Sequence, residues 1–317
     1  TLALFKLEIN DAEAIILARA LAHNTKLESI DHGSNQIGDT GATALAEALA
    51  KNTTLKEIGL YDNHIKDAGA TALAHALRTN KTLESIELWD NKIGDEGVIA
   101  IATMLAEESA LTSIELGANS ITSRGASKLA QALTHNRKLT SIALAFNKIG
   151  SKGAHELAKA LRDNTTLQWL NIEHNDINDE AAIALLSAIK DNPTLRSLNI
   201  KDNNISTVIV KKLVEVLTLP RTQLKELKLG YNNIEDEGAS ALADGLKAND
   251  TVEILHLAAI NISAAGARKL AEMLQHNTTL TTLKLDANNI GDEGATALAE
   301  ALRYNRTLTS ITLSTTN

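Results

Sequence analysis

The sequence repeats itself with a period of 28 residues. Counted from the first leucine position of each copy, the copies begin at Leu27 and at ten later positions, with one longer step of 29 residues between Leu195 and Leu224. Because one short copy cannot bury its apolar face alone, a fixed period of this kind indicates a solenoid of stacked copies. The sequence therefore predicts a single domain over 1–317, with ten complete repeats (27–307) between partial repeats at 1–26 and 308–317.

Each copy combines a strand pattern with a helix pattern. The first half follows L-x-x-I/L-x-L-x-x-N-x-I, as in the segment 55–65, and its apolar residues two apart predict a short strand with one buried face. The second half reads G-D-E-G-A-x-A-L-A-E-A-L over 291–302 and places apolar residues at helical spacing. Each repeat is thus expected to form one strand followed by one helix.

This alternation predicts the architecture as well as the elements. Adjacent strands lie about 4.8 Å apart, whereas packed helices need about 10 Å. A stack of strand–helix units must therefore curve, with its strands on the inside. The sequence predicts an α/β horseshoe, with a parallel β-sheet on the concave face and α-helices on the convex face.

Two polar residues recur at the ends of the predicted helices. Asp292 is predicted to be the N-cap of its helix, where a carboxylate suits the positive helix start. The asparagine that follows most helices is typical of a left-handed C-terminal residue. Most of the N-x-S/T sequons coincide with this asparagine, so we interpret them as a product of the repeat. The asparagines are Asn52, Asn80, Asn136, Asn164, Asn277 and Asn305.

The two patterns together resemble the ribonuclease-inhibitor-like class of leucine-rich repeats, over essentially the whole chain. They are similar to the repeats of NOD-like receptors, of the Ran GTPase-activating protein and of secreted effectors of intracellular bacteria. The resemblance implies a scaffold that binds another macromolecule. Members of this class share the scaffold and differ in what they hold, so the partner is not specified.

Composition and motifs argue against an enzyme. The chain has no cysteine, which removes thiol nucleophiles and Cys-ligated zinc and favours a reducing compartment. The net charge of −8 disfavours nucleic acid, and no apolar run is long enough to span a membrane. His174 and His256 face the concavity, and their spacing suggests no carboxylate partner. We expect a cytoplasmic, monomeric protein without catalytic residues, metal or cofactor.

Several positions depart from the pattern. His32 occupies an inward leucine position, which we interpret as tolerated near an open end. The seventh complete repeat lacks both helix-start glycines and carries the extra residue near Pro220, so an irregular helix is expected there. The chain begins and stops inside a repeat, which predicts a fragment of a longer protein.

The variable positions on the strand side predict a binding surface. The later repeats are mixed in charge, whereas the first four complete repeats are acidic, with Lys56 as the one exposed cation among the carboxylates. These carboxylates are Glu28, Asp31, Glu57, Asp62, Glu84, Glu87, Asp90 and Glu115.

Five of the seven aromatic residues also occupy exposed strand-side positions, where the fold does not need them. Aromatic residues of this kind often dominate interface energy, although they can also merely cover neighbouring backbone. The predicted partner is a protein with a basic patch. The predicted partner-binding residues are Tyr61, Asp62, Glu87, Trp89, Asp90, Glu115, Phe146 and Trp169, with Lys228 and Tyr231 as a second patch.

Two other functions follow from the resemblance. One is activation of a Ran-like small GTPase. The other is an autoinhibitory segment of a NOD-like receptor-type protein. A bacterial effector or an innate-immune-type sensor is compatible with the protein-binding prediction. Either role would change the cell in which the repeats act, but not the way in which they bind a partner.

Overall fold

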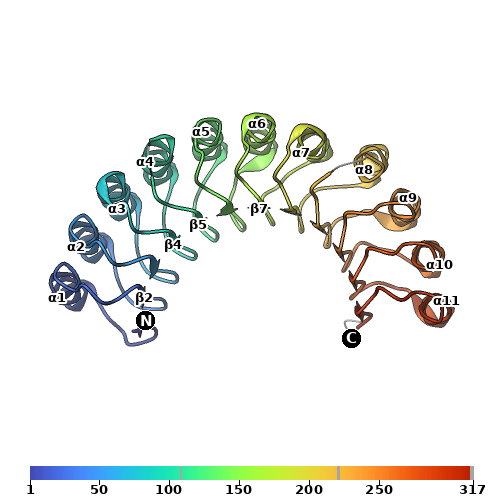
Figure 1. The fold of residues 1–317 in the computed structure, drawn as a ribbon, viewed down its shortest axis with the longest axis horizontal. Helices are drawn as coiled ribbons and strands as arrows, with labels where there is room; N and C mark the ends of the chain where they lie inside the picture. The colour runs from blue at the N-terminus through green and yellow to red at the C-terminus, as the bar shows by residue number, and fades with distance from the viewer. Residues whose placement is uncertain (108, 220–221, 315–317) are drawn as a thin grey trace. The chain divides into compact units, whose positions relative to one another are not determined.

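The computed structural model describes residues 1–107, 109–219 and 222–314. The chain divides into two compact units, Thr1–Leu167 (the N-terminal unit) and Gln168–Asn317 (the C-terminal unit). Within each unit, short strands line one side and helices line the other (Figure 1). The assignment of 1–317 to one domain stays a prediction.

The N-terminal unit alternates six strands with six helices in its described residues. All of its strand pairs are parallel and join neighbouring repeats, so that Ile58 lies opposite Ile86. The strands are β1 (Leu2–Ala3), β2 (Ser29–Asp31), β3 (Glu57–Gly59), β4 (Ser85–Glu87), β5 (Ser113–Glu115) and β6 (Ser141–Ala143). The helices are α1 (Asp11–Leu21), α2 (Asp39–Leu49), α3 (Asp67–Thr79), α4 (Asp95–Ala106), α5 (Ser123–Leu133) and α6 (Gly150–Asp163).

The C-terminal unit repeats this construction, again with parallel strands. Its strands are β7 (Trp169–Asn171), β8 (Ser197–Asn199), β9 (Glu226–Lys228), β10 (Ile254–His256), β11 (Thr282–Lys284) and β12 (Ser310–Thr312). Its helices are α7 (Asp179–Asp191), α8 (Val210–Leu217), α9 (Glu235–Leu246), α10 (Ala264–Leu274) and α11 (Gly291–Leu302), with a 3₁₀ turn η1 (Thr207–Ile209) before α8. The predicted α/β solenoid is confirmed.

The core lies between the strands and the helices of each unit. Leu55, Ile58, Leu60 and Ile65 of one repeat are all buried, as the strand pattern predicts. Full burial of such a side chain stabilises the fold by roughly 1.5–3 kcal/mol. Alanines on the helices, such as Ala70, are buried as well, and their small size allows neighbouring helices to pack closely.

A buried or half-buried asparagine follows most strands and joins neighbouring repeats. The Asn63 amide donates to the carbonyl of His32 in the preceding repeat at 3.0 Å, and its Oδ1 accepts from the Ile37 backbone N–H at 2.9 Å. Asn91 repeats both bonds one repeat later. These bonds satisfy backbone groups that would otherwise be buried without partners.

The predicted N-cap role of Asp292 is wrong. Helix α11 begins at Gly291, and Asp292 lies in its first turn. The equivalent aspartates of earlier repeats cap the helix of the following repeat instead. Asp67 Oδ1 accepts from the backbone N–H groups of Gly94 and Gly97 at 2.7 and 2.9 Å, where α4 begins. A Cβ atom at Gly97 would lie 2.9 Å from that oxygen, so the glycine allows the close approach.

The predicted left-handed conformation of the helix-end asparagines is also wrong. Asn80 is extended, with φ −68° and ψ 127°. Its amide donates to the carbonyl of Leu49 in the preceding repeat at 2.7 Å, and its Oδ1 accepts from the Leu83 backbone N–H at 2.8 Å. Asn164 makes the same bond to Leu133 and is 0 % exposed. Asparagine recurs here because its side chain bridges two repeats, which supports the structural interpretation of the sequons.

The seventh complete repeat is irregular, as expected. Its helix is divided into η1 and the short α8, and Ser206 caps η1 by accepting from the Val208 N–H. The Ser206 hydroxyl also donates to Asp179 Oδ2 at 2.7 Å, which keeps the bond between repeats despite the missing glycine. The extra residue near Pro220 lies outside the described residues.

His32 is 0 % exposed, and neither ring nitrogen has a hydrogen-bond partner. Burial lowers the pKa of His32 to about 4, against the opposing charge of Asp31. Because the ring is fully buried, closeness to an open end does not explain why histidine is tolerated here.

Candidate protein-binding surfaces

Four positions in each repeat point away from the helices and form what we call the strand face. They are the first and third residues of the strand and the two residues after the next buried leucine. In the second complete repeat these are Glu57, Gly59, Tyr61 and Asp62. The ten predicted binding residues all occupy such positions, in one unit or the other.

In the N-terminal unit the ring of Tyr61 lies over the backbone of the preceding repeat. A Cβ atom at Gly33 would lie only 2.1 Å from Tyr61 Cζ, so glycine is required beneath the ring. The Tyr61 hydroxyl donates to Asp31 Oδ2 at 3.2 Å. Burial and the Asp31 carboxylate raise the pKa of Tyr61.

Trp89 lies over the backbone of the following repeat in the same manner. A Cβ atom at Gly117 would lie 2.1 Å from the indole ring. The indole also meets Phe146 edge to face, with ring centroids 5.6 Å apart and planes at 76°. Phe146 is 42 % exposed and has a φ of 55°, which lifts its ring from the sheet. The rings therefore cover backbone, as the alternative interpretation predicts, and still present apolar surface.

Carboxylates lie beside these rings. Glu87 and Glu115 are direct partners in the register of β4 and β5. Burial, together with the charges of Glu115, Asp31 and Glu57, raises the pKa of Glu87, and burial raises the pKa of Glu115. Like charges directly opposite each other on a sheet are destabilising.

Asp62 and Asp90 lie next to this carboxylate pair, both exposed and both with a φ of 52°. Aspartate tolerates this left-handed conformation better than most residues. Across the described part of the N-terminal unit, no cation pairs with Asp62, Glu87, Asp90 or Glu115. We call these four residues with Tyr61, Trp89 and Phe146 the acidic-aromatic surface.

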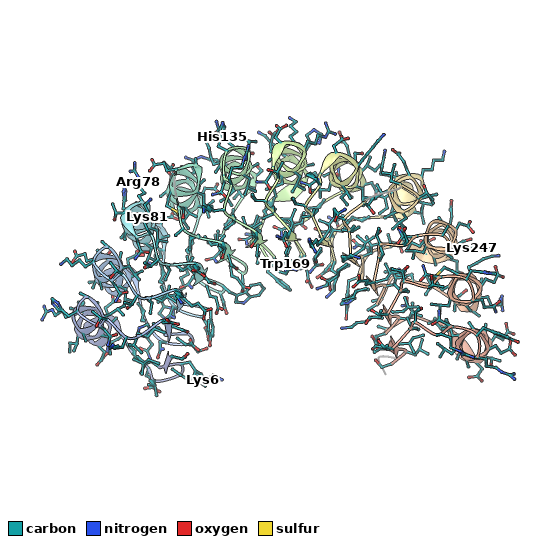
Figure 2. The ribbon with its side chains drawn as sticks, in the orientation of Figure 1. Lys6, Arg78, Lys81, His135, Trp169 and Lys247 are labelled. Atoms are coloured by element: carbon teal, nitrogen blue, oxygen red, sulfur yellow. The ribbon has the colours of Figure 1, made fainter. Side chains whose placement is uncertain are left out.

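The remaining predicted residues belong to the C-terminal unit. Trp169 begins β7 and is half-buried (Figure 2). Lys228 ends β9, with its ammonium 3.0 Å from Glu226 Oε1. Tyr231 is 52 % exposed, and the Lys201 ammonium lies 5.2 Å from its ring centroid. Lys201 was not among the predicted binding residues, although it occupies the repeat position of Tyr61 and Trp89.

His174 has a carboxylate partner, contrary to the expectation from sequence. Its Nδ1 lies 2.7 Å from Asp202 Oδ2, and the two residues occupy the same position in successive repeats. The separation of one repeat period was the signal that could have identified the pair. Both side chains are largely exposed, as is common for surface ion pairs.

Comparison with known proteins identifies the family. A leucine-rich repeat model matches residues 23–46, 51–74, 79–102, 135–158, 163–186 and 191–214. A second model, the leucine-rich domain of the TMOD/LMOD family, matches 222–316. The chain is a leucine-rich repeat protein. This confirms the family predicted from the sequence, whereas its ribonuclease-inhibitor-like class stays a prediction.

Among solved structures that are similar to this chain, one internalin shares its fold. An internalin from Listeria monocytogenes is 21 % identical, with coverage of 92 % of this chain and 82 % of that chain and a TM-score of 0.51. The actin-binding site 2 of leiomodin-1 is 22 % identical over 56 % of this chain and 87 % of that chain, with a TM-score of 0.37. The tropomodulin C-terminal domain from Caenorhabditis elegans is 17 % identical over 40 % and 76 %, with a TM-score of 0.34. No curated protein matches in sequence.

The leucine-rich repeat families that match this chain are scaffold proteins. Such proteins are typically non-enzymatic, and their repeats typically bind other proteins. Within 1–107, 109–219 and 222–314, no three His, Asp or Glu side chains are arranged to hold a metal ion. No helix in those ranges is long and apolar enough to cross a bilayer.

Proposed function

We propose that this leucine-rich repeat protein is a non-catalytic scaffold that binds a protein partner through the acidic-aromatic surface. The observation that carries the proposal is a set of strand-face carboxylates without cation partners, placed beside partly exposed aromatic rings. The partner surface that fits them carries lysine or arginine side chains.

The charge of the surface supports a basic partner. The raised pKa of Glu87 means that the folded protein disfavours its ionised form, because the carboxylate is partly buried and its neighbours are also acidic. A cation placed between Glu87 and Glu115 would reverse that effect. Complementary charge also speeds the encounter of two proteins, more than it strengthens the final complex.

The aromatic rings supply the affinity in this proposal. Tyr61 and Trp89 already pack over the backbone at Gly33 and Gly117, so little side-chain freedom is lost on binding. Truncation of such a ring to alanine at the centre of an interface weakens the binding free energy by about 2 kcal/mol or more.

We also propose that the protein works as a monomer in a cytoplasm, which the absence of cysteine supports. A bacterial effector delivered into a host cytoplasm and an innate-immune-type sensor both fit this setting, because both would use the same binding surface.

The test is an affinity pull-down from cytosolic lysate, followed by mass spectrometry. The variant combines Trp89→Ala with Glu87→Lys, and the matched control is Glu47→Lys on the exposed side of α2. We expect a protein that the wild type and the control retain and the double variant loses. Equal retention by all three proteins would show that the partner binds elsewhere.

A further inference from the structure

A row of basic side chains crosses three strands of the C-terminal unit. Lys228, His256 and Lys284 are the third residues of β9, β10 and β11, and each is in register with the next. Neighbouring side chains on such strands are about 4.8 Å apart and point to the same face. We call these three residues the cationic row.

The row has one internal counter-ion. Glu226 Oε1 lies 3.0 Å from the Lys228 ammonium and 4.0 Å from His256 Nε2, and its other oxygen accepts from the Ser197 hydroxyl at 2.6 Å. Burial opposes the ionisation of Glu226, but the bonds from Ser197 and Lys228 hold its pKa below the usual value. Glu226 is therefore fully engaged within the unit.

Lys284, at the other end of the row, has no such partner. Within residues 168–219 and 222–314, no carboxylate forms an ion pair with its ammonium. The nearby Lys201 pairs with Glu173 at 2.9 Å and also lies against the ring of Tyr231. Asp286, on the same face, accepts from the hydroxyl groups of Thr312 and Ser314. Lys284 is therefore the lysine of the row whose ammonium, among the described residues, has no carboxylate partner.

His256 lies between the two lysines of the row. Burial and the charges of Lys284 and Lys228 lower its pKa to about 4, with Lys201 acting in the same direction and Glu226 in the opposite one. The imidazole is therefore neutral near pH 7. An anion brought against the row would favour its protonated form and raise that pKa.

We propose that the cationic row is a second binding surface, which takes an acidic peptide segment of a protein partner. Lysine ammonium groups donate to the carboxylates of such a segment, whereas Glu173 and Glu226 on the same face are already engaged with Lys201 and Lys228. A nucleic-acid backbone offers only acceptors, which these two carboxylates repel. The net charge of −8 also disfavours a polynucleotide.

The proposal is tested with a short fluorescent oligoglutamate peptide, whose binding is measured by anisotropy at low salt. Lys284→Gln removes the ammonium that has no ion-pair partner, so it leaves no buried carboxylate unpaired. We expect it to weaken binding by about fivefold to tenfold. The matched control is Lys247→Gln at the end of α9, on the helix side of the unit (Figure 2), which should bind like the wild type.

A second measurement follows the His256 imidazole by NMR during a pH titration, with and without the peptide. We expect the peptide to raise the pKa of His256. Equal binding by Lys284→Gln and the wild type, or equal loss in both lysine variants, would overturn the proposal. Tighter binding of a single-stranded oligonucleotide than of the peptide, lost in Lys284→Gln, would replace the peptide with a nucleic acid.

The two proposed surfaces are separable in this assay. Glu87→Lys lies in the N-terminal unit and should leave peptide binding unchanged, while it abolishes retention of the basic partner. The peptide assay can therefore contradict the proposal for the cationic row while the pull-down supports the acidic-aromatic surface. The opposite pair of results is equally distinguishable.

Discussion

His32 shows how a single buried side chain makes stability depend on pH. Its pKa in the folded protein, about 4, lies below the ordinary value of 6.5, because burial disfavours the charged ring. The unfolded chain therefore takes up a proton first as pH falls. The free energy of unfolding is therefore unaffected by protonation of His32 above about pH 6.5. It falls progressively as the pH is lowered to about 4, by up to roughly 3 kcal/mol.

We predict that His32→Leu stabilises the protein by about 1–2 kcal/mol near pH 7, because it removes two unsatisfied ring nitrogens. Leu60 and Leu88 occupy the same position in the next two repeats, so leucine suits the site. The gain should be larger near pH 5, where the unfolded wild type is protonated. Urea unfolding at both pH values measures it.

His256→Gln is the control, since His256 also has a pKa of about 4 but is only partly buried. His256→Gln should change the pH dependence of the free energy of unfolding, but it should not raise that free energy near pH 7 as His32→Leu does. A lower urea midpoint for His32→Leu at both pH values would contradict the explanation given for His32.

At the scale of the element, the helices depend on residues of the preceding repeat. Asp67 satisfies two N–H groups at the start of α4 that have no partner within their own helix. Loss of a helix cap usually costs about 0.5–2 kcal/mol. Loss of this cap would therefore weaken the contact between two neighbouring repeats, and not only one helix.

We predict that Asp67→Ala lowers the free energy of unfolding by about 1–2 kcal/mol. Asp292→Ala is the matched control, because Asp292 occupies the same place in α11 and accepts no such bond within the described residues. It should change stability by less than about 0.5 kcal/mol. Urea unfolding of both variants decides the matter, and equal losses would show that the aspartate acts on its own helix.

At the scale of the whole molecule, binding and stability are opposed on the acidic-aromatic surface. The pKa of Glu87 is raised in the folded state, so the protonated form favours folding. The corresponding stability is present below the ordinary pKa of a glutamate and is lost as pH rises through the raised value. At neutral pH the ionised Glu87 therefore works against the fold.

We predict that Glu87→Gln raises the free energy of unfolding near pH 7 by a few tenths of a kcal/mol, a small effect because solvent screens a half-exposed carboxylate. The same substitution should weaken binding of the basic partner. Glu47→Gln on α2 should change neither property. Urea unfolding and the pull-down assay measure the two effects, and a loss of stability in Glu87→Gln would refute the opposition.

The sequence predicts much of the fold because the repeat period carries it. Leu55, Ile58 and Leu60 have the spacing of a half-buried strand, and they are buried as expected. The errors concern contacts between repeats. Asp292 and Asn80 were assigned to the ends of their own helices, whereas residues in these positions mainly bond to the adjacent repeat.

The sequence predicts which residues lie on the strand face, but it does not predict how their side chains pack against one another. Repeat alignment places Tyr61 and Trp89 on the strand face, but it does not reveal that their rings lie over Gly33 and Gly117. Nor does it show that Lys201 lies against Tyr231, because side-chain direction depends on packing. Aligning whole repeats, rather than reading along the chain, would have paired His174 with Asp202.

The aspartate that caps the next helix has a consequence for how such a chain can change in length. Repeats that carry this aspartate present the same acceptor to their successor, as in Asp39 with Gly69 and Asp67 with Gly97. Duplication or deletion of one whole period leaves every joint chemically complete. A change of any other length within the helix-start segment would separate these donors from their acceptors, whereas the extra residue between Leu195 and Leu224 is accommodated outside that segment.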